Sequence, residues 1–335
     1  AWIGDLSNIF MKSIDLDSTT GTIPESLFAT FQMTFAIITP ALIIGAFVER
    51  IKFSAMLIFI SLWILIVYVP VTHWVWGGGI LSSWGTMDFA GGIVVHATAG
   101  TAALITALTL GKRRGFPKSI TPPHSPILTM IGAAMLWVGW FGFNAGSALG
   151  ANGGAGMAML VTHISASMAA LVWMFIEWKR FGKPSLIGVV TGMVAGLATV
   201  TPASGYIGIP GGLVLGFSGG LLCYLAVDYI RGKLLIDDSL DVFAVHGVGG
   251  ILGTLLVAFL ATSTFSGLGL PEGQTAMSQF VVQVKAVILT VIWTSIFTYL
   301  ILKVTSLIVP LRVDEQEEIE GLDLRSHGEK GYHSD

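Results

Sequence analysis

Long apolar runs decide what this chain can fold into. Nine stretches of the sequence carry almost no charged side chains, and about 20 helical residues are enough to cross a hydrocarbon layer of roughly 30 Å. Charged residues make up only 11% of the chain, whereas soluble domains hold roughly 25%. The sequence therefore predicts an all-α polytopic membrane protein embedded in a lipid bilayer, with nine transmembrane helices at about 26–48, 54–72, 89–111, 127–147, 157–180, 186–200, 211–230, 241–262 and 280–307.

The positive charges indicate which side of the membrane each connection faces. Cytoplasmic connections carry an excess of Lys and Arg. An extracytoplasmic loop at 1–25, a transmembrane domain at 26–310 and a cytoplasmic tail at 311–335 are therefore predicted, in a plasma (inner) membrane. The prediction rests on Lys and Arg gathering in alternate connections, at 50–52, 112–118, 179–183 and 231–233, and being absent from 73–90, 148–156, 201–210 and 264–278.

Two histidines stand in similar apolar segments. His96 belongs to D-F-A-G-G-I-V-V-H-A-T-A-G, which starts at Asp88, and His246 belongs to D-V-F-A-V-H-G-V-G-G, which starts at Asp241. The first segment follows an outer loop and the second an inner loop, and related segments of opposite direction indicate an inverted repeat with a shared site near the midplane. At 1.5 Å per residue, His96 lies about 12 Å along its helix from Asp88, and His246 lies about 7.5 Å along its helix from Asp241. They are predicted to meet inside the membrane, where an isolated histidine is costly.

Other readings of these polar residues stay open. Either histidine alone could be satisfied by a backbone carbonyl, whereas a metal site is disfavoured because Asp241 lies about 140° around the helix from His246. Asp88 has the residue type and place of a helix cap, and its charge would also favour cations at the outer mouth. The single cysteine, Cys223, excludes a disulfide framework. No nucleophile–base pair, cofactor loop or basic aromatic patch is evident, so we expect no enzyme activity, no cofactor, no metal and no nucleic-acid partner.

Several longer motifs resemble one membrane family. The motifs are W-G-G-G at 76–79, D-F-A-G-G-x-V-V-H at 88–96, G-W-F-G-F-N-A-G-S at 139–147, D-V-F-x-V-H-G at 241–247 and E-G-L-D-x-x-x-H-G-E at 320–329. In matching order they resemble the ammonium transporter family (Amt/Mep/Rh), most closely its bacterial Amt branch. The resemblance implies an eleven-helix inverted-repeat fold, assembled as a trimer, of which this chain lacks the first two helices. It then divides into a truncated first half at 26–115, a second half at 126–263 and a last long helix at 280–310.

The resemblance also implies a site that recruits substrate. Phe31, Trp76 and Ser147 match the positions that hold the ammonium ion in the family's outer vestibule. Aromatic faces and one hydroxyl suit a compact cation with four donors, at about 0.5–2 kcal/mol for each cation–π contact. On residue type alone, Trp74, Trp76 and Trp84 would form an interfacial aromatic belt. The resemblance separates Trp76 from that belt and leaves Trp74 and Trp84 in it.

The remaining site residues follow the path inward from the vestibule. Asp88 matches a family position near the recruitment site. Phe35 and Phe143 match two stacked phenylalanines that block the path below it. His96 and His246 match a hydrogen-bonded pair of histidines that lines a narrow apolar pore. A pair of neutral imidazoles can pass a small donor–acceptor molecule or a proton between nitrogens.

These implied residues predict membrane transport of ammonium/ammonia, with methylammonium as an analogue. The ion would be recruited at the vestibule, deprotonated at the phenylalanine gate and passed along the twin histidines as ammonia. The alternatives are a neutral ammonia or carbon dioxide channel of the Rh type and a non-conducting ammonium sensor. The charged tail matches the region through which the bacterial branch communicates with a PII-type regulator, and a merely solvated tail is the other reading.

Overall fold

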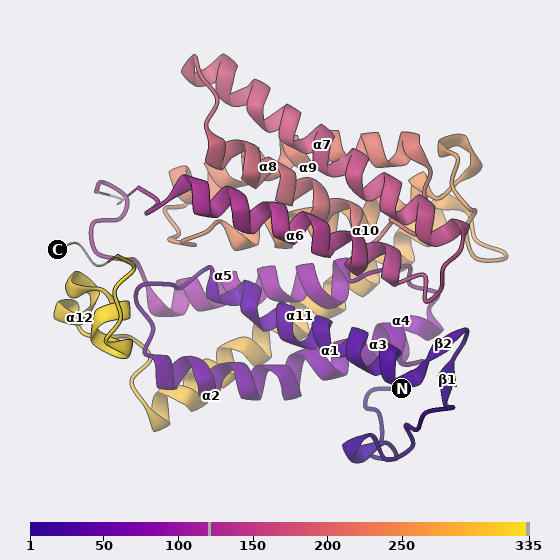
Figure 1. Ribbon diagram of the computed structural model, residues 1–335, viewed down its shortest axis with the longest axis horizontal. Coiled ribbons are helices and arrows are strands. Elements are labelled where there is room, and N and C mark those ends of the chain that lie inside the picture. Colours follow the sequence, from indigo (N-terminus) through magenta and orange to yellow (C-terminus); the bar gives the residue numbers. More distant parts are fainter. Residues whose placement is uncertain (120–121, 333–335) are drawn as a thin grey trace.

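The computed structural model describes residues 1–119 and 122–332, and helices dominate it (Figure 1). The α-helices are α1 (Glu25–Ile44), α2 (Phe53–Trp63), α3 (Val69–Trp76), α4 (Ile80–Ser83), α5 (Thr98–Leu110), α6 (Pro126–Gly146), α7 (Gly153–Phe181), α8 (Leu186–Val200), α9 (Ile209–Val227), α10 (Val248–Leu260), α11 (Ala276–Ile308) and α12 (Glu315–Glu320). Wider π-helical turns are η2 (Ile64–Tyr68), η3 (Gly92–Ala97), η4 (Asp228–Lys233), η5 (Phe243–Gly247) and η7 (Asp323–His327). Two short 3₁₀ turns are η1 (Ile9–Met11) and η6 (Ser263–Phe265).

The helices reproduce the predicted membrane spans. Among the described residues, eight helical segments are long and apolar enough to cross a membrane, and α8 is a shorter apolar helix. Each coincides with one of the nine predicted runs, so the polytopic all-α prediction is confirmed. The predicted end of the second span at residue 72 was wrong. The helix continues through Trp76, where the Gly77 N–H still donates to the His73 carbonyl, and only the following glycines form the turn.

The helices form two groups that lie side by side (Figure 1). One group contains α1, α2, α3, α5 and α11, and the other contains α6 to α10. A two-stranded hairpin, β1 (Thr19–Thr20) and β2 (Ile23–Pro24), lies at one end of the bundle, with Thr19 opposite Pro24. Helix α12 lies at the other end. We call these the hairpin end and the tail end.

Two segments that begin with a π-helical turn cross in the middle of the molecule. η3 continues into α5, and η5 continues into α10. The crossing is a contact of backbones: a Cβ on Gly100 would fall on the backbone of Gly247, and a Cβ on Gly250 would lie 2.5 Å from the Cβ of His96. Small residues permit such close helix approach in membranes. The glycines therefore bring the two histidine segments together.

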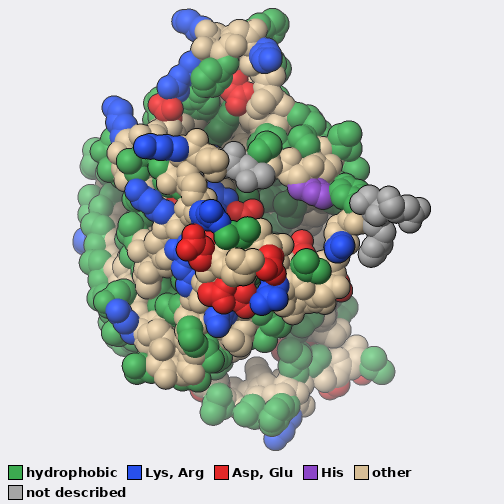
Figure 2. Space-filling view, turned by 90° about the vertical axis from the view of Figure 1, so that its left-hand side faces the viewer, with side chains coloured by type: hydrophobic (Ala, Val, Ile, Leu, Met, Phe, Trp, Pro, Cys, Tyr) green, Lys and Arg blue, Asp and Glu red, His purple; other side chains and the backbone are tan. Residues whose placement is uncertain are grey.

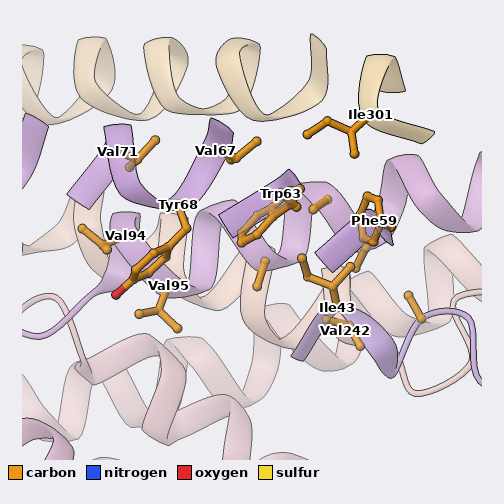
Figure 3. Packing of buried hydrophobic residues seen from close by; sticks show 14 of the residues in the cluster. Ile43, Phe59, Trp63, Val67, Tyr68, Val71, Val94, Val95, Val242 and Ile301 are labelled. Atoms are coloured by element: carbon orange, nitrogen blue, oxygen red, sulfur yellow. The ribbon is translucent and has the colours of Figure 1, made fainter. Parts of the chain in front are cut away.

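A large apolar core fills the first group of helices (Figure 3). Trp63 lies at its centre, fully buried, and its indole N–H donates to the Thr298 hydroxyl of α11 at 3.0 Å. The last long helix is thus packed into the same core as the first half of the chain. The residues drawn in Figure 3 include Ile43, Phe59, Trp63, Val67, Tyr68, Val71, Val94, Val95, Val242 and Ile301.

Charged side chains gather at the tail end, as Figure 2 shows. Arg50 is fully buried there and donates to the Ser239 hydroxyl at 2.8 Å and the Asp237 carbonyl at 2.6 Å. Burial lowers the pKa of Arg50 to about 10, which keeps it charged at neutral pH. Arg113 binds both carboxylate oxygens of Asp237 and also reaches Glu49 at 3.0 Å. This network ties the end of α1 to the connection before η5.

Candidate functional site

Asp88 closes the start of η3 with a single carboxylate. The side chain is 3% exposed. Its Oδ1 accepts the N–H groups of Gly91 and Gly92 at 2.9 and 2.6 Å, and its Oδ2 accepts those of Ile93 and Val94 at 2.8 and 3.2 Å. A helix start leaves four N–H groups without partners, and this carboxylate accepts all four. Both carboxylate oxygens are therefore occupied by backbone N–H groups.

A chain of aromatic rings runs inward from Asp88. The Trp76 indole N–H donates to the Asp88 carbonyl at 2.8 Å. The edge of Phe35 meets Trp76 with ring centres 5.3 Å apart and meets Phe31, one helical turn away on α1, at 4.9 Å. Phe143 of α6 lies 4.4 Å from Phe35, with the two rings tilted by 39°. The structure thus brings the two predicted aromatic recruitment residues and both predicted gate residues into one contact chain.

Ser147 contacts this group of aromatic residues through Phe143. Its hydroxyl donates to the carbonyl of Phe143 at 2.9 Å, one turn back on α6. A Cβ on Gly146 would lie 3.0 Å from the ring of Phe31, so the end of α6 passes close to α1. The serine oxygen still has acceptor capacity after it has donated its hydrogen.

The two histidines meet at the crossing of η3 and η5. Nδ1 of His96 and Nδ1 of His246 are 3.2 Å apart, and the ring centres are 5.2 Å apart with 21° between the planes. Both rings are buried, at 1% and 8% exposure. If both are neutral, one Nδ1 donates and the other accepts, so the two rings must be opposite tautomers. Their Nε2 atoms then differ: one is a donor and the other an acceptor.

Trp140 is a residue of this site that the sequence reasoning missed. Its ring lies 5.4 Å from that of His96 and only 15° from parallel, and its indole N–H donates to the Thr201 hydroxyl at 2.9 Å. Phe143, three residues further along α6, lies 6.2 Å from His96. The signal was available, because residues three apart on a helix share a face.

Asp238, rather than Asp241, is the counterpart of Asp88. It precedes His246 by eight residues, as Asp88 precedes His96, and its Oδ2 accepts the Phe243 N–H at 2.7 Å, the same five-residue step as from Asp88 to Ile93. Asp241 has a positive φ of 56° and reaches Arg231 at 3.6 Å. The sequence comparison had aligned the wrong acid. The two halves share the pattern D-x₇-H-x₃-G.

Trp74 also departs from the prediction. It was expected in an interfacial belt, but it is fully buried. Its indole N–H donates to the Trp2 carbonyl at 2.8 Å, and its ring meets the rings of Trp2 and Trp293 edge-on. The belt reading was wrong because the N-terminal segment folds over this position. Trp84 is half-buried.

With this geometry described, comparison with known proteins is decisive. The family model described as Ammonium Transporter Family matches residues 2–332. The chain belongs to the ammonium transporter family. It is 48% identical over 318 residues to the ammonium transporter of Aquifex aeolicus, covering 95% of this chain and 74% of that protein. It is 47% identical over 311 residues to ammonium transporter Amt1 of Archaeoglobus fulgidus, covering 92% of this chain and 78% of that protein.

Solved structures of the ammonium transporter family share the fold. Candida albicans Mep2 matches with a TM-score of 0.84 at 33% identity, over 94% of this chain and 72% of that one. A protein titled Sensor Amt Protein matches with a TM-score of 0.83 at 31% identity, over 90% of this chain and 76% of that one. The family and fold expected from the motifs are therefore confirmed.

The arrangement in this family member combines three chemical environments in sequence. Asp88 and Trp76 present a negative field and an aromatic face. Phe35 and Phe143 form an apolar contact without hydrogen-bonding groups. Beyond them, the histidine pair offers a donor and an acceptor in an otherwise apolar setting. A small molecule that is a cation at one stage and a neutral donor–acceptor at the next fits this order.

Proposed function

We propose that this chain transports ammonium/ammonia across a membrane along a narrow apolar path lined by His96 and His246. The observation that carries the proposal is the 3.2 Å contact between the two buried imidazoles. It is supported by the family to which the chain belongs and by relatives that are named ammonium transporters.

Recruitment takes place at Phe31, Trp76 and Ser147, with Asp88 next to Trp76. The ammonium ion is held by aromatic faces, at about 0.5–2 kcal/mol each, and by the Ser147 oxygen as an acceptor. The carboxylate of Asp88 adds its field without a direct bond, since both its oxygens are already used by backbone N–H groups. Capture of a cation is therefore weak, which suits a site that must also release it.

The contact between Phe35 and Phe143 selects the neutral form. An unpaired charge in an apolar environment costs tens of kcal/mol in the limit of a low dielectric, and the rings offer no oxygen to replace water. The ion therefore transfers one proton to water on the outer side of the gate, and the resulting ammonia continues. His96 and His246 then donate to and accept from ammonia in turn, so it meets a hydrogen-bonding partner in the apolar path. Ammonia takes up a proton again in the water on the far side.

The orientation and assembly belong to the same proposal. The hairpin end faces outward and the tail end faces the cytoplasm of a plasma (inner) membrane, which the positions of Lys and Arg favour. The transporter is a homotrimer, as its family resemblance implies. A PII-type regulator binds at the tail end. The C-terminal tail is attached to this end of the bundle, where Glu318 accepts the Arg114 N–H and pairs with Arg312, each at 2.7 Å. This attachment supports the tail as the region that the regulator contacts.

Uptake of labelled methylammonium into cells without their own ammonium transporters tests the histidine path. The His96→Ala, His246→Ala double variant should lose about tenfold or more of its uptake, since two hydrogen-bonding partners at about 1 kcal/mol each are removed. His163→Ala is the matched control: this histidine is exposed on α7 and stacks on Trp137 at 5.2 Å, away from the pair. Wild-type uptake by the double variant, at equal membrane expression, would refute the path.

Two rival functions differ in what else they predict. A sensor is favoured by the structural match to a protein titled Sensor Amt Protein, and it would give no uptake in the same assay. A neutral gas channel of the Rh type would give uptake without current, although Trp76 and Ser147 suit capture of a cation. Current recorded from reconstituted protein on addition of ammonium separates this channel from a carrier that moves net charge.

A further inference from the structure

The short segment before Asp88 has no regular secondary structure of its own. Residues 85–89 belong to the connection between α4 and η3 and have a non-helical conformation. Buried backbone N–H and C=O groups need hydrogen-bond partners, and here the partners come from other elements. The Asp88 carbonyl accepts from Trp76, and the Phe89 N–H donates to the Pro202 carbonyl at 3.0 Å. We call Asp88 and Trp76 the mouth of the proposed path. The position of Asp88 in it thus depends on side chains and backbone that are distant in sequence.

Gln283 of α11 makes the most complete of these attachments. Its side chain is fully buried. Its Oε1 accepts the Met87 N–H at 2.9 Å while its Nε2 donates to the Met87 carbonyl at 2.7 Å, so it binds both polar groups of one residue. The second Nε2 hydrogen goes to the Thr254 carbonyl of α10 at 2.9 Å. One amide therefore links the segment before Asp88 to the helix that follows His246.

A second glutamine extends the attachment by one helical turn. Gln279 donates to the Gly85 carbonyl at 2.9 Å and to the Oε1 of Gln283 at 3.1 Å. Residues four apart on a helix are separated by about 6 Å along its axis, and residues two apart in an extended segment by about 6.6 Å. The two glutamines of α11 therefore match Gly85 and Met87 in spacing. With both bonds from Gln279 and Met87, each donor and acceptor of the Gln283 amide is in use.

We propose that Gln283 is a positioning residue that sets the affinity of the mouth for its cation without touching the cation. It fixes the backbone of Met87, and the next residue carries both the Asp88 carboxylate and the carbonyl that orients Trp76. Loss of the hydrogen bonds between Gln283 and Met87 therefore moves the Asp88 carboxylate and the Trp76 ring together. The inference rests on the proposed function, because the affected quantity is the apparent affinity for ammonium.

The test compares Gln283→Met with Thr290→Val. Methionine keeps length and apolar volume but removes the hydrogen bonds, whereas Thr290 is a buried residue of the same helix whose hydroxyl has no hydrogen-bond partner among the described residues. In methylammonium uptake, Gln283→Met should raise the KM by about threefold or more with a maximal rate within about twofold of wild type. Gln279→Met, which loses the bonds to Gly85 and to the Gln283 Oε1 but leaves both bonds between Gln283 and Met87, should give a smaller rise. Thr290→Val should match wild type.

Hydrogen exchange of the purified proteins gives a readout that needs no transport. The amides of residues 85–92 should exchange faster in Gln283→Met than in wild type or Thr290→Val. An unchanged KM in Gln283→Met, or unchanged protection of this segment, would overturn the positioning role while transport by the wild type stands. Absence of uptake in the wild type itself would instead refute the proposed function, and the exchange result would then decide alone whether Gln283 holds the segment.

Discussion

Asp88 and Asp238 occupy the same place in the two halves but are not equally satisfied. Asp88 receives four backbone N–H groups. In Asp238, Oδ2 accepts from Phe243, while Oδ1 is buried without a partner among the described residues. A buried carboxylate that lacks hydrogen bonds favours its protonated form. Loss of water around Asp238 raises its pKa to about 6, and the hydrogen bond from the Phe243 N–H and the nearby charge of Arg50 only partly oppose this.

The raised pKa of Asp238 predicts how stability depends on pH. Between about pH 4 and pH 6 the folded protein keeps a proton that the unfolded chain has lost, so stability falls as the pH rises through this window. Asp238→Asn removes the charge and keeps an oxygen for the Phe243 N–H. Its melting temperature in detergent should therefore exceed that of wild type at pH 7.5, with the gap closing toward about pH 4. A lower melting temperature at pH 7.5 would show that the ionised form is needed for the fold.

A second decline in stability with rising pH should be present in both the wild type and Asp238→Asn. Burial also raises the pKa of Asp241 to about 7, so its deprotonation costs stability at a higher pH. The comparison therefore concerns the difference between the two proteins at each pH.

At the residue scale, the spacing of the motifs allowed site residues to be predicted, whereas the three-dimensional surroundings of each residue could not be predicted from the sequence. The eight-residue step from Asp88 to His96 indicated a cap followed by a membrane histidine, and the cap is present. The sequence could not rank Asp238 against Asp241, because the choice depends on the turn at 237–241 and its bonds to Arg50 and Ala46. Gln283 gave no separate signal, since its importance comes from Met87, 196 residues away. Trp140 could have been found, because it lies three residues before Phe143 on α6 and shares a helix face with it.

At the scale of elements, the close contact of α5 with η5 requires a glycine at position 100. Gly100→Ala places a methyl group on the backbone of Gly247, and overpacking of this kind costs typically 1–3 kcal/mol. The control is Gly132→Ala on α6, where a Cβ meets nothing within 4 Å and alanine favours the helix by up to about 1 kcal/mol. The melting temperature should fall in the first variant and hold or rise in the second. Equal melting of Gly100→Ala and wild type would contradict the close crossing.

The existence and order of the helices could be read from hydropathy, because each span must bury its own backbone bonds in lipid. Their internal irregularities could not. The π-helical turns η3 and η5 lie inside continuous apolar runs and have no distinct composition. They arise where the two histidine segments meet, which is a tertiary contact.

At the scale of the whole molecule, the proposed orientation can be tested with two single cysteines. Glu272→Cys lies in the connection before α11 at the hairpin end, and Lys330→Cys lies in the tail, and both positions are exposed. An impermeant maleimide should label the first in intact cells and the second only after permeabilisation. The native Cys223 is buried and serves as the background control. Labelling of both positions from the same side would contradict the arrangement.

The shared D-x₇-H-x₃-G pattern has a consequence for how such a protein can originate. In the crossing, Gly100 makes room for the partner half at Gly247, and Gly250 makes room for it at His96. Each half supplies what the other requires, so one ancestral half facing an inverted copy of itself would satisfy both contacts with a single short gene. After duplication and fusion the halves are free to diverge elsewhere. A larger side chain at either glycine, however, requires a compensating substitution in the opposite half.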